Sequence, residues 1–211
     1  MELEQSQLEY LANRGKNYDK KYYMFEKLLN KIDNVNSVIE LFGGIGIEST
    51  YIENKFNNIC KHIIIEKDNK CFECLQKRFW NNKHIDIYNV DCFDFVYNDM
   101  VDLLVVDSTF NKKVSNKVLK LITNFKAKQI IITETGVFGV KFNKNLTYEQ
   151  YWNNVKYNLS KIGLFLTDVE YYTDFGLMLI KTSNNNKPLN LHYVTKECQS
   201  LLWRDIRDGI I

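Results

Sequence analysis

Four hydrophobic runs of the chain carry an acidic residue at or near their ends, and a glycine-rich turn follows the first run. The turn is Glu40-Leu41-Phe42-Gly43-Gly44-Ile45-Gly46. Glycine lets the backbone turn tightly and approach a ligand, and the N-terminus of a following helix attracts negative or polar ligand groups. The second run ends at Glu66, about twenty residues later, where a carboxylate can accept two hydrogen bonds from a ribose diol. The third and fourth runs end at Asp91 and Asp107.

Two common nucleotide-binding loops do not fit this turn. A dinucleotide-binding loop has the pattern GxGxxG, but the third glycine position counted from Gly44 is Ser49. The phosphate-cradling pattern GxxxxGK[ST] is absent from the sequence. An acidic residue after a strand is most often a solvated turn residue or a helix cap. Four of them along the carboxyl edge of one sheet indicate a binding site, because doubly wound folds bind ligands there.

These residues need a scaffold that brings strand ends together. From Ser37 onward, short runs rich in Ile, Val and Leu alternate with longer amphipathic stretches, as in βα repeats around a parallel sheet that is buried on both faces. The pattern predicts strands at 37–42, 61–66, 85–90, 102–107 and 127–133, and helices at 46–57, 69–82 and 113–125.

The pattern changes after Thr147, which is placed to cap a helix through Ile162. Two strand-like runs follow, 164–172 and 175–182, and their close spacing predicts a hairpin. The sequence therefore predicts an α/β fold with a Rossmann-like, doubly wound, mostly parallel seven-stranded sheet, one antiparallel strand near its edge, and helices on both faces.

The chain divides into three expected segments. Residues 1–36 form an N-terminal helical segment, 37–183 the main domain, and 184–211 a C-terminal loop and helix. Residues 13–23 interleave basic and aromatic side chains, which fits a surface that touches nucleic acid but is better explained as a solvated helix start.

Composition restricts the function classes. The 28 basic and 26 acidic residues leave a net charge of +2, which does not by itself indicate nucleic-acid binding. The start of the chain does not resemble a signal peptide, and no apolar run reaches the ~18 residues that span a bilayer. Five cysteines without an export signal indicate reduced thiols, so we expect a soluble, cytoplasmic protein without membrane contact.

No metal site is expected. Cys71 and Cys74 form a single Cys-x-x-Cys inside a predicted helix, without a second pair at ligand spacing, so they are interpreted as core residues. The three histidines, His62, His84 and His192, are scattered along the chain, and none of them is predicted to be catalytic.

Residues 37–182 resemble the class I S-adenosylmethionine-dependent methyltransferases. Glu40 to Gly46 is similar to the first motif of that family in its variant "acidic, Leu, Phe, small, Gly, any, Gly", which is common among RNA and DNA base methyltransferases. The resemblance implies S-adenosyl-L-methionine as the cofactor. The implied cofactor-binding residues are Glu40, Phe42, Gly44, Gly46, Glu66, Lys67, Asp91, Cys92 and Asp107.

The same resemblance implies a role for several of these residues. Glu40 orders the loop and the methionine end of the cofactor, and Gly44 and Gly46 give the cofactor room. Glu66 holds the ribose hydroxyls. Asp91 receives the adenine amino group, with Cys92 and Phe93 on either side of the adenine ring.

The segment Asp107-Ser108-Thr109-Phe110 concerns the substrate. Methyltransferases of exocyclic amines have Asp or Asn, two prolines and an aromatic residue here, and this chain keeps the carboxylate and the ring but lacks the prolines. By this likeness Asp107 and Phe110 are the catalytic residues. Asp107 accepts a hydrogen bond from the attacking amine and Phe110 stacks on the base. Without proline the loop is less pre-organised.

Other methyltransferase classes fit less well. Cytosine C5 methylation needs a Pro-Cys loop, and the one proline of this chain does not precede a cysteine. Ribose 2′-O methyltransferases of the Lys-Asp-Lys-Glu type have lysine at the end of the fifth strand, where this chain has residues 133–135, Thr-Glu-Thr. Lys16 or Lys20 with Asp107 and Glu170 would imitate three of the four residues.

We therefore expect an S-adenosylmethionine-dependent methyltransferase that acts on a nitrogen of a nucleic acid base, with RNA favoured over DNA as substrate and partner. One alternative is methylation of a protein or a small molecule. Another is a non-catalytic subunit of methyltransferase fold that binds RNA or a partner protein, which the missing prolines make conceivable.

Overall fold

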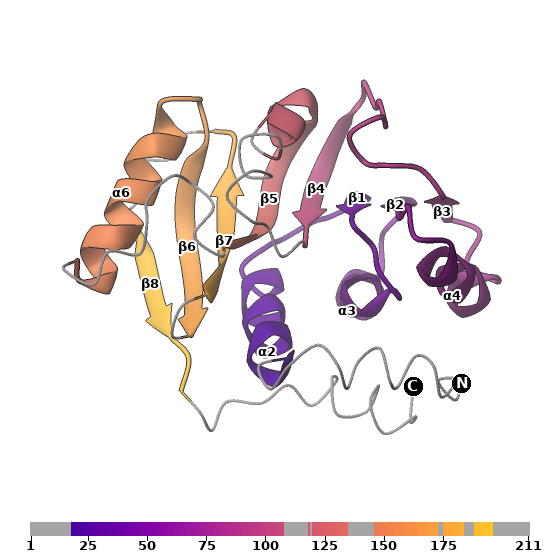
Figure 1. Cartoon of the computed structure of the whole chain (residues 1–211), viewed down its shortest axis with the longest axis horizontal. Coiled ribbons are helices and arrows are strands. Elements are labelled where there is room, and N and C mark those ends of the chain that lie inside the picture. Colours follow the sequence, from indigo (N-terminus) through magenta and orange to yellow (C-terminus); the bar gives the residue numbers. More distant parts are fainter. Residues whose placement is uncertain are drawn as a thin grey trace.

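The computed structural model describes residues 18–107, 118, 120–134, 146–172, 175–183 and 188–195. Within these residues, eight strands form one mixed sheet in the order β3-β2-β1-β4-β5-β7-β6-β8 (Figure 1). The strands are β1 (Ser37–Leu41), β2 (Lys61–Ile65), β3 (Ile85–Tyr88), β4 (Met100–Val106), β5 (Lys126–Glu134), β6 (Phe165–Tyr172), β7 (Phe175–Lys181) and β8 (Asn190–Tyr193). The helices are α2 (Tyr18–Leu29), α3 (Ile47–Lys55), α4 (Asn69–Phe79) and α6 (Tyr148–Ser160).

The sheet confirms the predicted fold class. Strands β1 to β5 are parallel, and the strand order reverses between β1 and β4, the switch point at which doubly wound sheets bind ligands. β7 is antiparallel to both of its neighbours, β5 and β6. The carboxyl ends of β1 to β6 therefore meet at one edge of the sheet.

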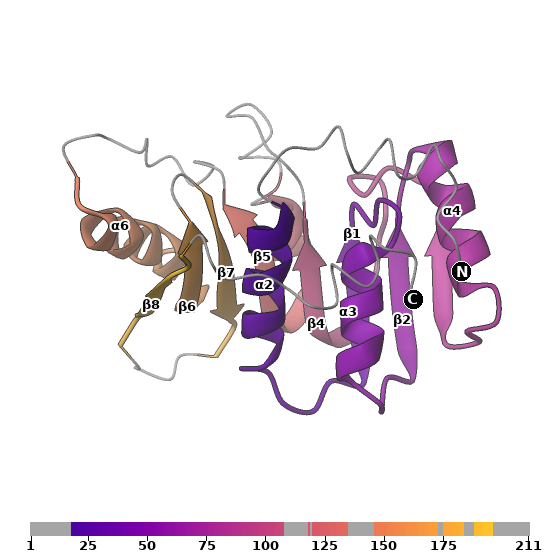
Figure 2. The same cartoon turned by 90° about the horizontal axis from the view of Figure 1, so that it is seen from below.

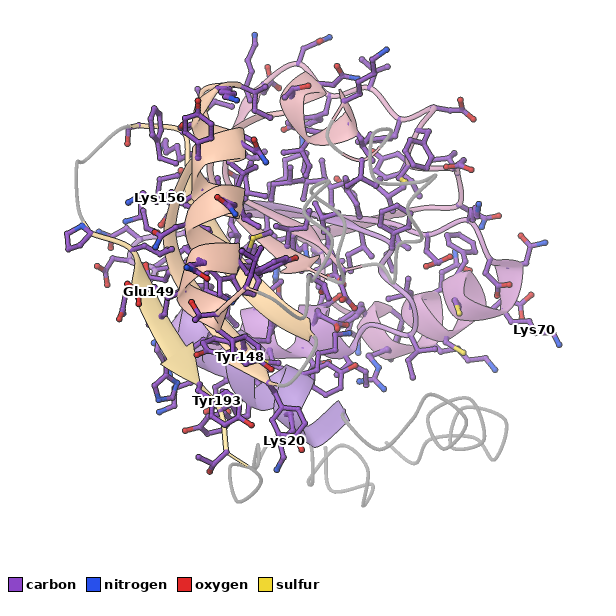
Figure 3. All side chains as sticks on the ribbon, turned by 60° about the vertical axis from the view of Figure 1, so that its left-hand side comes forward. Lys20, Lys70, Tyr148, Glu149, Lys156 and Tyr193 are labelled. Atoms are coloured by element: carbon purple, nitrogen blue, oxygen red, sulfur yellow. The ribbon has the colours of Figure 1, made fainter. Side chains whose placement is uncertain are left out.

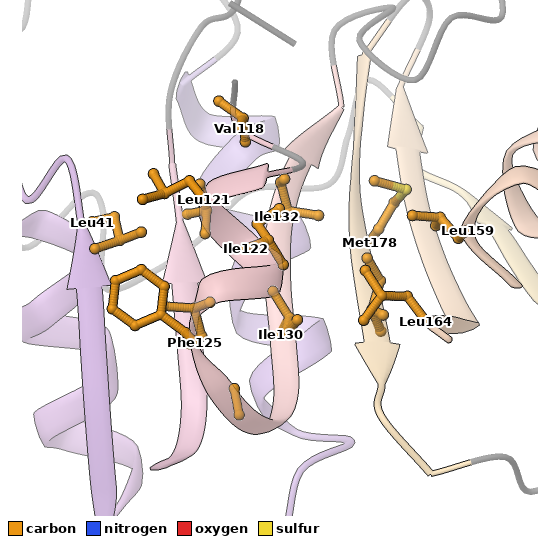
Figure 4. Close-up of a cluster of buried hydrophobic side chains, with 14 of the residues drawn as sticks. Leu41, Val118, Leu121, Ile122, Phe125, Ile130, Ile132, Leu159, Leu164 and Met178 are labelled. Carbon is orange, nitrogen blue, oxygen red and sulfur yellow. The ribbon is translucent and has the colours of Figure 1, made fainter. Parts of the chain in front are cut away.

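Helices cover both faces of the sheet. Figures 1 and 2 show α2, α3 and α4 on one face and α6 on the other, where the helical residues 118 and 120–124 also lie. Because side chains alternate between the two faces along a strand, each face of the sheet has its own hydrophobic cluster. Leu104 and Val106 of β4 belong to the cluster on the α6 face, and Leu103 and Val105 belong to the cluster on the α2 face. Figure 4 shows part of the first cluster.

Helix α6 begins where the sequence predicts. The Thr147 side chain accepts a hydrogen bond from the backbone N–H of Gln150, and the Gln150 side chain accepts one from the Thr147 N–H, which is a capping box. No helix in the described part of the chain is long and apolar enough to cross a membrane.

Strand β8 was missed by the sequence analysis, which predicted only a loop and a helix over 184–211. Asn190–Tyr193 pair in parallel with β6, with Tyr193 opposite Tyr171. Only Leu191 of these four residues packs against the core, and the alternation of polar and apolar residues is too short to predict a strand. Pairing with the open edge of β6 forms it instead. Residues 196–208 of the predicted C-terminal helix lie outside the described residues.

Candidate active site at the carboxyl edge of the sheet

The glycine turn after β1 has three residues with left-handed backbone geometry, Phe42 (φ 64°), Gly44 (φ 55°) and Gly46 (φ 82°). A Cβ at Gly46 would lie 2.7 Å from Cε2 of Phe79, so this glycine allows the turn to pack against α4. At Gly44 the nearest atom to such a Cβ would be the Phe42 carbonyl oxygen, 4.0 Å away. Gly44 is therefore the position where the turn leaves open space beside the backbone.

Glu66, just after β2, lies directly beside this turn. Its Oε2 accepts a hydrogen bond of 2.8 Å from the Gly44 N–H, and its Oε1 accepts one of 2.8 Å from the Asp68 N–H. The two backbone donors fix the carboxylate next to the open side of Gly44. The structure thus brings together two of the residues that the sequence analysis assigned to the cofactor, although the ribose contact itself stays a prediction.

Asp91, after β3, is held by its neighbours. Its carboxylate accepts hydrogen bonds from the Phe93 N–H (3.1 Å) and from Nζ of Lys67 (3.2 Å). Partial burial opposes ionisation, but these donors outweigh it and keep the pKa of Asp91 below its usual value. The Phe93 ring is 39% exposed and meets the Phe42 ring edge-on at 6.2 Å. The Cys92 side chain is buried in the core, and burial raises the pKa of its thiol to about 12.

Glu40 is the buried end of a chain of polar groups. Its Oε2 accepts a hydrogen bond of 2.5 Å from Ser49 and lies 3.5 Å from Nε2 of His62, while its Oε1 has no partner among the described residues. Nδ1 of His62 lies 2.8 Å from Oε1 of Glu53, whose Oε2 lies 2.6 Å from Nε2 of His84. Burial opposes a charge on His62, but the two carboxylates raise its pKa above the usual value.

The sequence analysis missed this chain of groups because His62 and His84 are far apart in sequence and neither ends a strand. The strand register is the signal that could have indicated these contacts. His62 is the first buried residue of β2 and pairs with β1, and a polar side chain in such a position needs a buried hydrogen-bond partner.

Asp107 follows β4 on the face covered by α2. Its Oδ1 accepts a hydrogen bond of 2.6 Å from the Thr133 hydroxyl of β5, and its Oδ2 pairs with Nζ of Lys21 from α2. The same ammonium donates to Oε1 of Glu48, at the start of α3, over 2.7 Å. We call Lys21, Glu48 and Asp107 the buried triad.

The two carboxyl groups of the buried triad have pKa values that are shifted in opposite directions. Desolvation raises the pKa of Glu48 to about 8, and the charge of Lys21 only partly offsets it. Desolvation also acts on Asp107, but the charge of Lys21 and hydrogen bonds from Glu48, Lys21 and Thr133 hold the pKa of Asp107 below its usual value. At neutral pH Asp107 is therefore ionised and Glu48 carries the proton.

Sequence reasoning did not identify Lys21 or Glu48. Lys21 belongs to the basic and aromatic stretch that was interpreted as a solvated helix start, yet it lies four and seven residues before the buried Phe25 and Leu28, on the same face of α2. Glu48 resembled an ordinary acidic residue in the first turn of a helix. The signal for Lys21 was its helical spacing.

Other assigned residues lie outside the site as described. Phe110 and Lys16 are outside the described residues. Glu170, considered for a ribose methyltransferase site, accepts a hydrogen bond of 2.7 Å from Nζ of Lys31, and its other oxygen lies 2.6 Å from Nδ1 of His192.

Comparison with known proteins bears on the fold alone. No protein family and no curated protein matches the sequence. The structure is similar to TYW2 from M. jannaschii in complex with AdoMet, with 18% sequence identity and a TM-score of 0.54 over 81% of this chain and 78% of that one. It is also similar to the 23S rRNA methyltransferase ErmE, with 10% identity and a TM-score of 0.54 over 81% of this chain and 70% of that one.

A third similar structure is the mitomycin 7-O-methyltransferase MmcR, with 11% identity and a TM-score of 0.58. The match covers 85% of this chain but only 59% of the other, so this chain spans little more than half of that enzyme. ErmE and MmcR are methyltransferases named for different substrates, and both share with TYW2 the architecture found here. The chain therefore has the class I methyltransferase fold.

Proposed function

We propose that the protein is an S-adenosylmethionine-dependent methyltransferase that methylates a nitrogen of a nucleic acid base, with RNA as the favoured substrate. The observation that carries the proposal is the Glu66 carboxylate, fixed beside the open position of Gly44 at the switch point of the sheet. A carboxylate in this place suits a ribose diol.

The residues present fit the cofactor. Oε1 of Glu40 is a buried acceptor without a partner among the described residues, and the adjoining turn has space that no Cβ occupies at Gly44. A ligand that carries several hydrogen-bond donors suits both features. Glu66 would bind the ribose hydroxyls and Asp91 the adenine amino group, with Phe42, Lys67 and Cys92 as the remaining contacts, whereas the open side of Gly46 faces α4. When bound, S-adenosylmethionine supplies a methyl group on a positively charged sulfur.

Asp107 would then act on the substrate. It is ionised at neutral pH and is held in place by Lys21 and Thr133. Three donors, counting the Glu48 carboxyl group, do not saturate the lone pairs of a carboxylate, so Asp107 can still accept a hydrogen bond from an attacking amine, orient it, and take up its proton. Phe110 would stack on the base.

Titration calorimetry with S-adenosylmethionine tests the cofactor site. We expect micromolar binding by the wild-type protein and an affinity at least tenfold lower for Glu66→Ala, because hydrogen bonds to a charged group contribute about 1.5–3 kcal/mol each. Glu73→Ala is the matched control, since Glu73 is an exposed glutamate of the adjacent helix α4. Absence of micromolar binding by the wild type, or equal affinities of wild type and Glu66→Ala, would contradict the proposal.

The similarity to MmcR favours a second candidate, methylation of a small molecule. Transfer of a labelled methyl group to total RNA, DNA, protein and a small-molecule extract separates the two. We expect label in RNA, and none in RNA with Asp107→Asn. Label confined to the small-molecule fraction would favour the second candidate and leave the cofactor site intact.

A further inference from the structure

Four tyrosines gather around the carboxyl end of β6, outside the site described above. Tyr171 and Tyr172 end β6, Tyr148 begins α6, and Tyr193 ends β8. We call them the tyrosine cluster. Figure 3 shows Tyr148 and Tyr193 close to each other at the same end of the molecule.

The rings of the tyrosine cluster are in contact. Tyr171 lies 5.0 Å from Tyr148 and 5.4 Å from Tyr193 between ring centroids, and Tyr193 lies 6.4 Å from Tyr172 in a stacked arrangement. Because side chains alternate along a strand, Tyr171 packs on the α6 side of the sheet and Tyr172 on the α2 side. Tyr193 therefore spans the edge of the sheet, and its side chain is 46% exposed.

A tryptophan connects the tyrosine cluster to the centre of the sheet. Trp152 of α6 lies 6.3 Å from Tyr171 between ring centroids, and a Cβ at Gly176 would lie 2.9 Å from its Cζ2 atom. Gly176 pairs with Glu134, the last residue of β5 and the neighbour of Thr133, which binds Asp107. The tyrosine cluster after β6 and Asp107 after β4 thus lie at the same, carboxyl edge of the sheet.

The Trp152 indole also holds an unused donor. Its Nε1 is buried and has no acceptor among the described residues, although buried indole N–H groups usually find a partner. The ring atoms nearest to a Cβ built at Gly176 are Cζ2 and Cη2 of the six-membered ring.

We propose that the tyrosine cluster binds unstacked bases of single-stranded RNA and thereby positions the strand whose target base reaches Asp107. Aromatic rings on a protein surface stack on bases of any sequence. Beneath the cluster, Nζ of Lys31 lies 2.7 Å from Glu170 and 3.4 Å from Asp168, so a positive charge accompanies the two carboxylates of β6. The proposal names the substrate class of the proposed function and rests on it, but RNA binding itself is measurable without methyl transfer.

Fluorescence anisotropy with a labelled single-stranded RNA dodecamer tests this proposal. Stacking on one aromatic ring contributes about 1–3 kcal/mol, so we expect Tyr193→Ala to weaken binding about 5- to 150-fold and Tyr193→Phe to retain it. Tyr157→Ala is the matched control, because Tyr157 is a 62% exposed tyrosine of α6 whose ring contacts Lys161 instead. We expect the corresponding RNA duplex to bind more weakly than the single strand.

Each outcome decides the proposal. Binding by Tyr193→Ala equal to the wild type, equal losses in Tyr193→Ala and Tyr157→Ala, or no binding by the wild type would overturn it. S-adenosylmethionine titration of Tyr193→Ala separates this failure from that of the proposed function: unchanged cofactor affinity shows that the fold and the cofactor site are intact. Should Tyr193→Ala fail to fold, Tyr148→Ala replaces it with the same expectation.

Discussion

At the scale of single residues, the buried triad is the least expected feature of the site. Lys21 brings one positive charge to two carboxyl groups, and the low dielectric of the interior makes a second negative charge there expensive. The proton therefore stays on Glu48, and Asp107 is left as the single anion. This arrangement gives an ionised carboxylate at the end of β4 without prolines to hold the loop.

The pH dependence of stability tests this assignment. The pKa of Glu48 is about 8 in the folded protein against 4.5 for an unperturbed glutamate, so the folded state binds the additional proton between these values. Stability must then fall as the pH rises from about 5 to 8, by up to about 1.4 kcal/mol per pH unit. Lys21, whose pKa is raised, stays charged in both states throughout this range.

Glu48→Gln removes this titration but keeps a polar side chain of the same size. We expect urea unfolding at pH 5, 6, 7 and 8 to give a flatter profile for Glu48→Gln than for the wild type, with the difference growing toward pH 8. Taking the difference between the two proteins cancels every other titrating group. Parallel profiles would mean that Glu48 is already ionised at pH 5.

At the scale of elements, the sequence analysis succeeded where a pattern repeats over several residues. The buried strands β1, β2, β4 and β5 were predicted because runs of Ile, Val and Leu alternate with longer amphipathic stretches, and their shared edge followed from parallel pairing. Strand β8 was not predicted, since it forms through pairing with β6 and not through its own apolar pattern. Tertiary contacts decide such short elements.

The same limit applies to the candidate site. Glu66 was placed beside the glycine turn by counting along one βα unit. Two partners of Asp107, Lys21 of α2 and Glu48 of α3, lie 86 and 59 residues earlier in the sequence. No local pattern relates positions so far apart. Only the packing of α2 across the sheet brings them together.

The glycine turn gives an element-scale prediction. Alanine at Gly46 must adopt a left-handed conformation and place its Cβ within 2.8 Å of Leu75 and Phe79. Gly163 has a similar φ of 76° but nothing within 4 Å, so Gly163→Ala isolates the cost of the backbone conformation, about 1–2 kcal/mol. We expect Gly46→Ala to lose a further ~1–3 kcal/mol from overpacking.

Thermal or urea unfolding of the two variants measures the cost of the backbone conformation and the additional cost of overpacking. Equal losses in stability would show that α4 yields to the new methyl group, and the account of Gly46 as a packing glycine would then be wrong. A larger loss in Gly46→Ala supports it.

At the scale of the whole molecule, the N-terminal segment is part of the core. Met24, Phe25 and Leu28 of α2 are fully or almost fully buried in the cluster that includes Leu103 of β4 and Leu177 of β7. α2 packs against β6 and β7, and its Lys21 reaches Asp107. Removal of α2 would therefore expose one face of the sheet and leave Asp107 without its cation.

Phe25→Ala tests whether α2 and the sheet unfold as one unit. Truncation of a fully buried phenylalanine costs about 3–5 kcal/mol, whereas Glu26→Ala at the neighbouring exposed position should change stability by less than about 0.5 kcal/mol. We expect urea to abolish far-ultraviolet circular dichroism and S-adenosylmethionine binding in one shared transition, with the midpoint lowered in Phe25→Ala. If the sheet could stay folded without α2, Phe25→Ala would instead show an early partial transition of α2, and the sheet would unfold later at the wild-type midpoint. One shared transition is expected because the α2 side chains complete the same core cluster as the central strands.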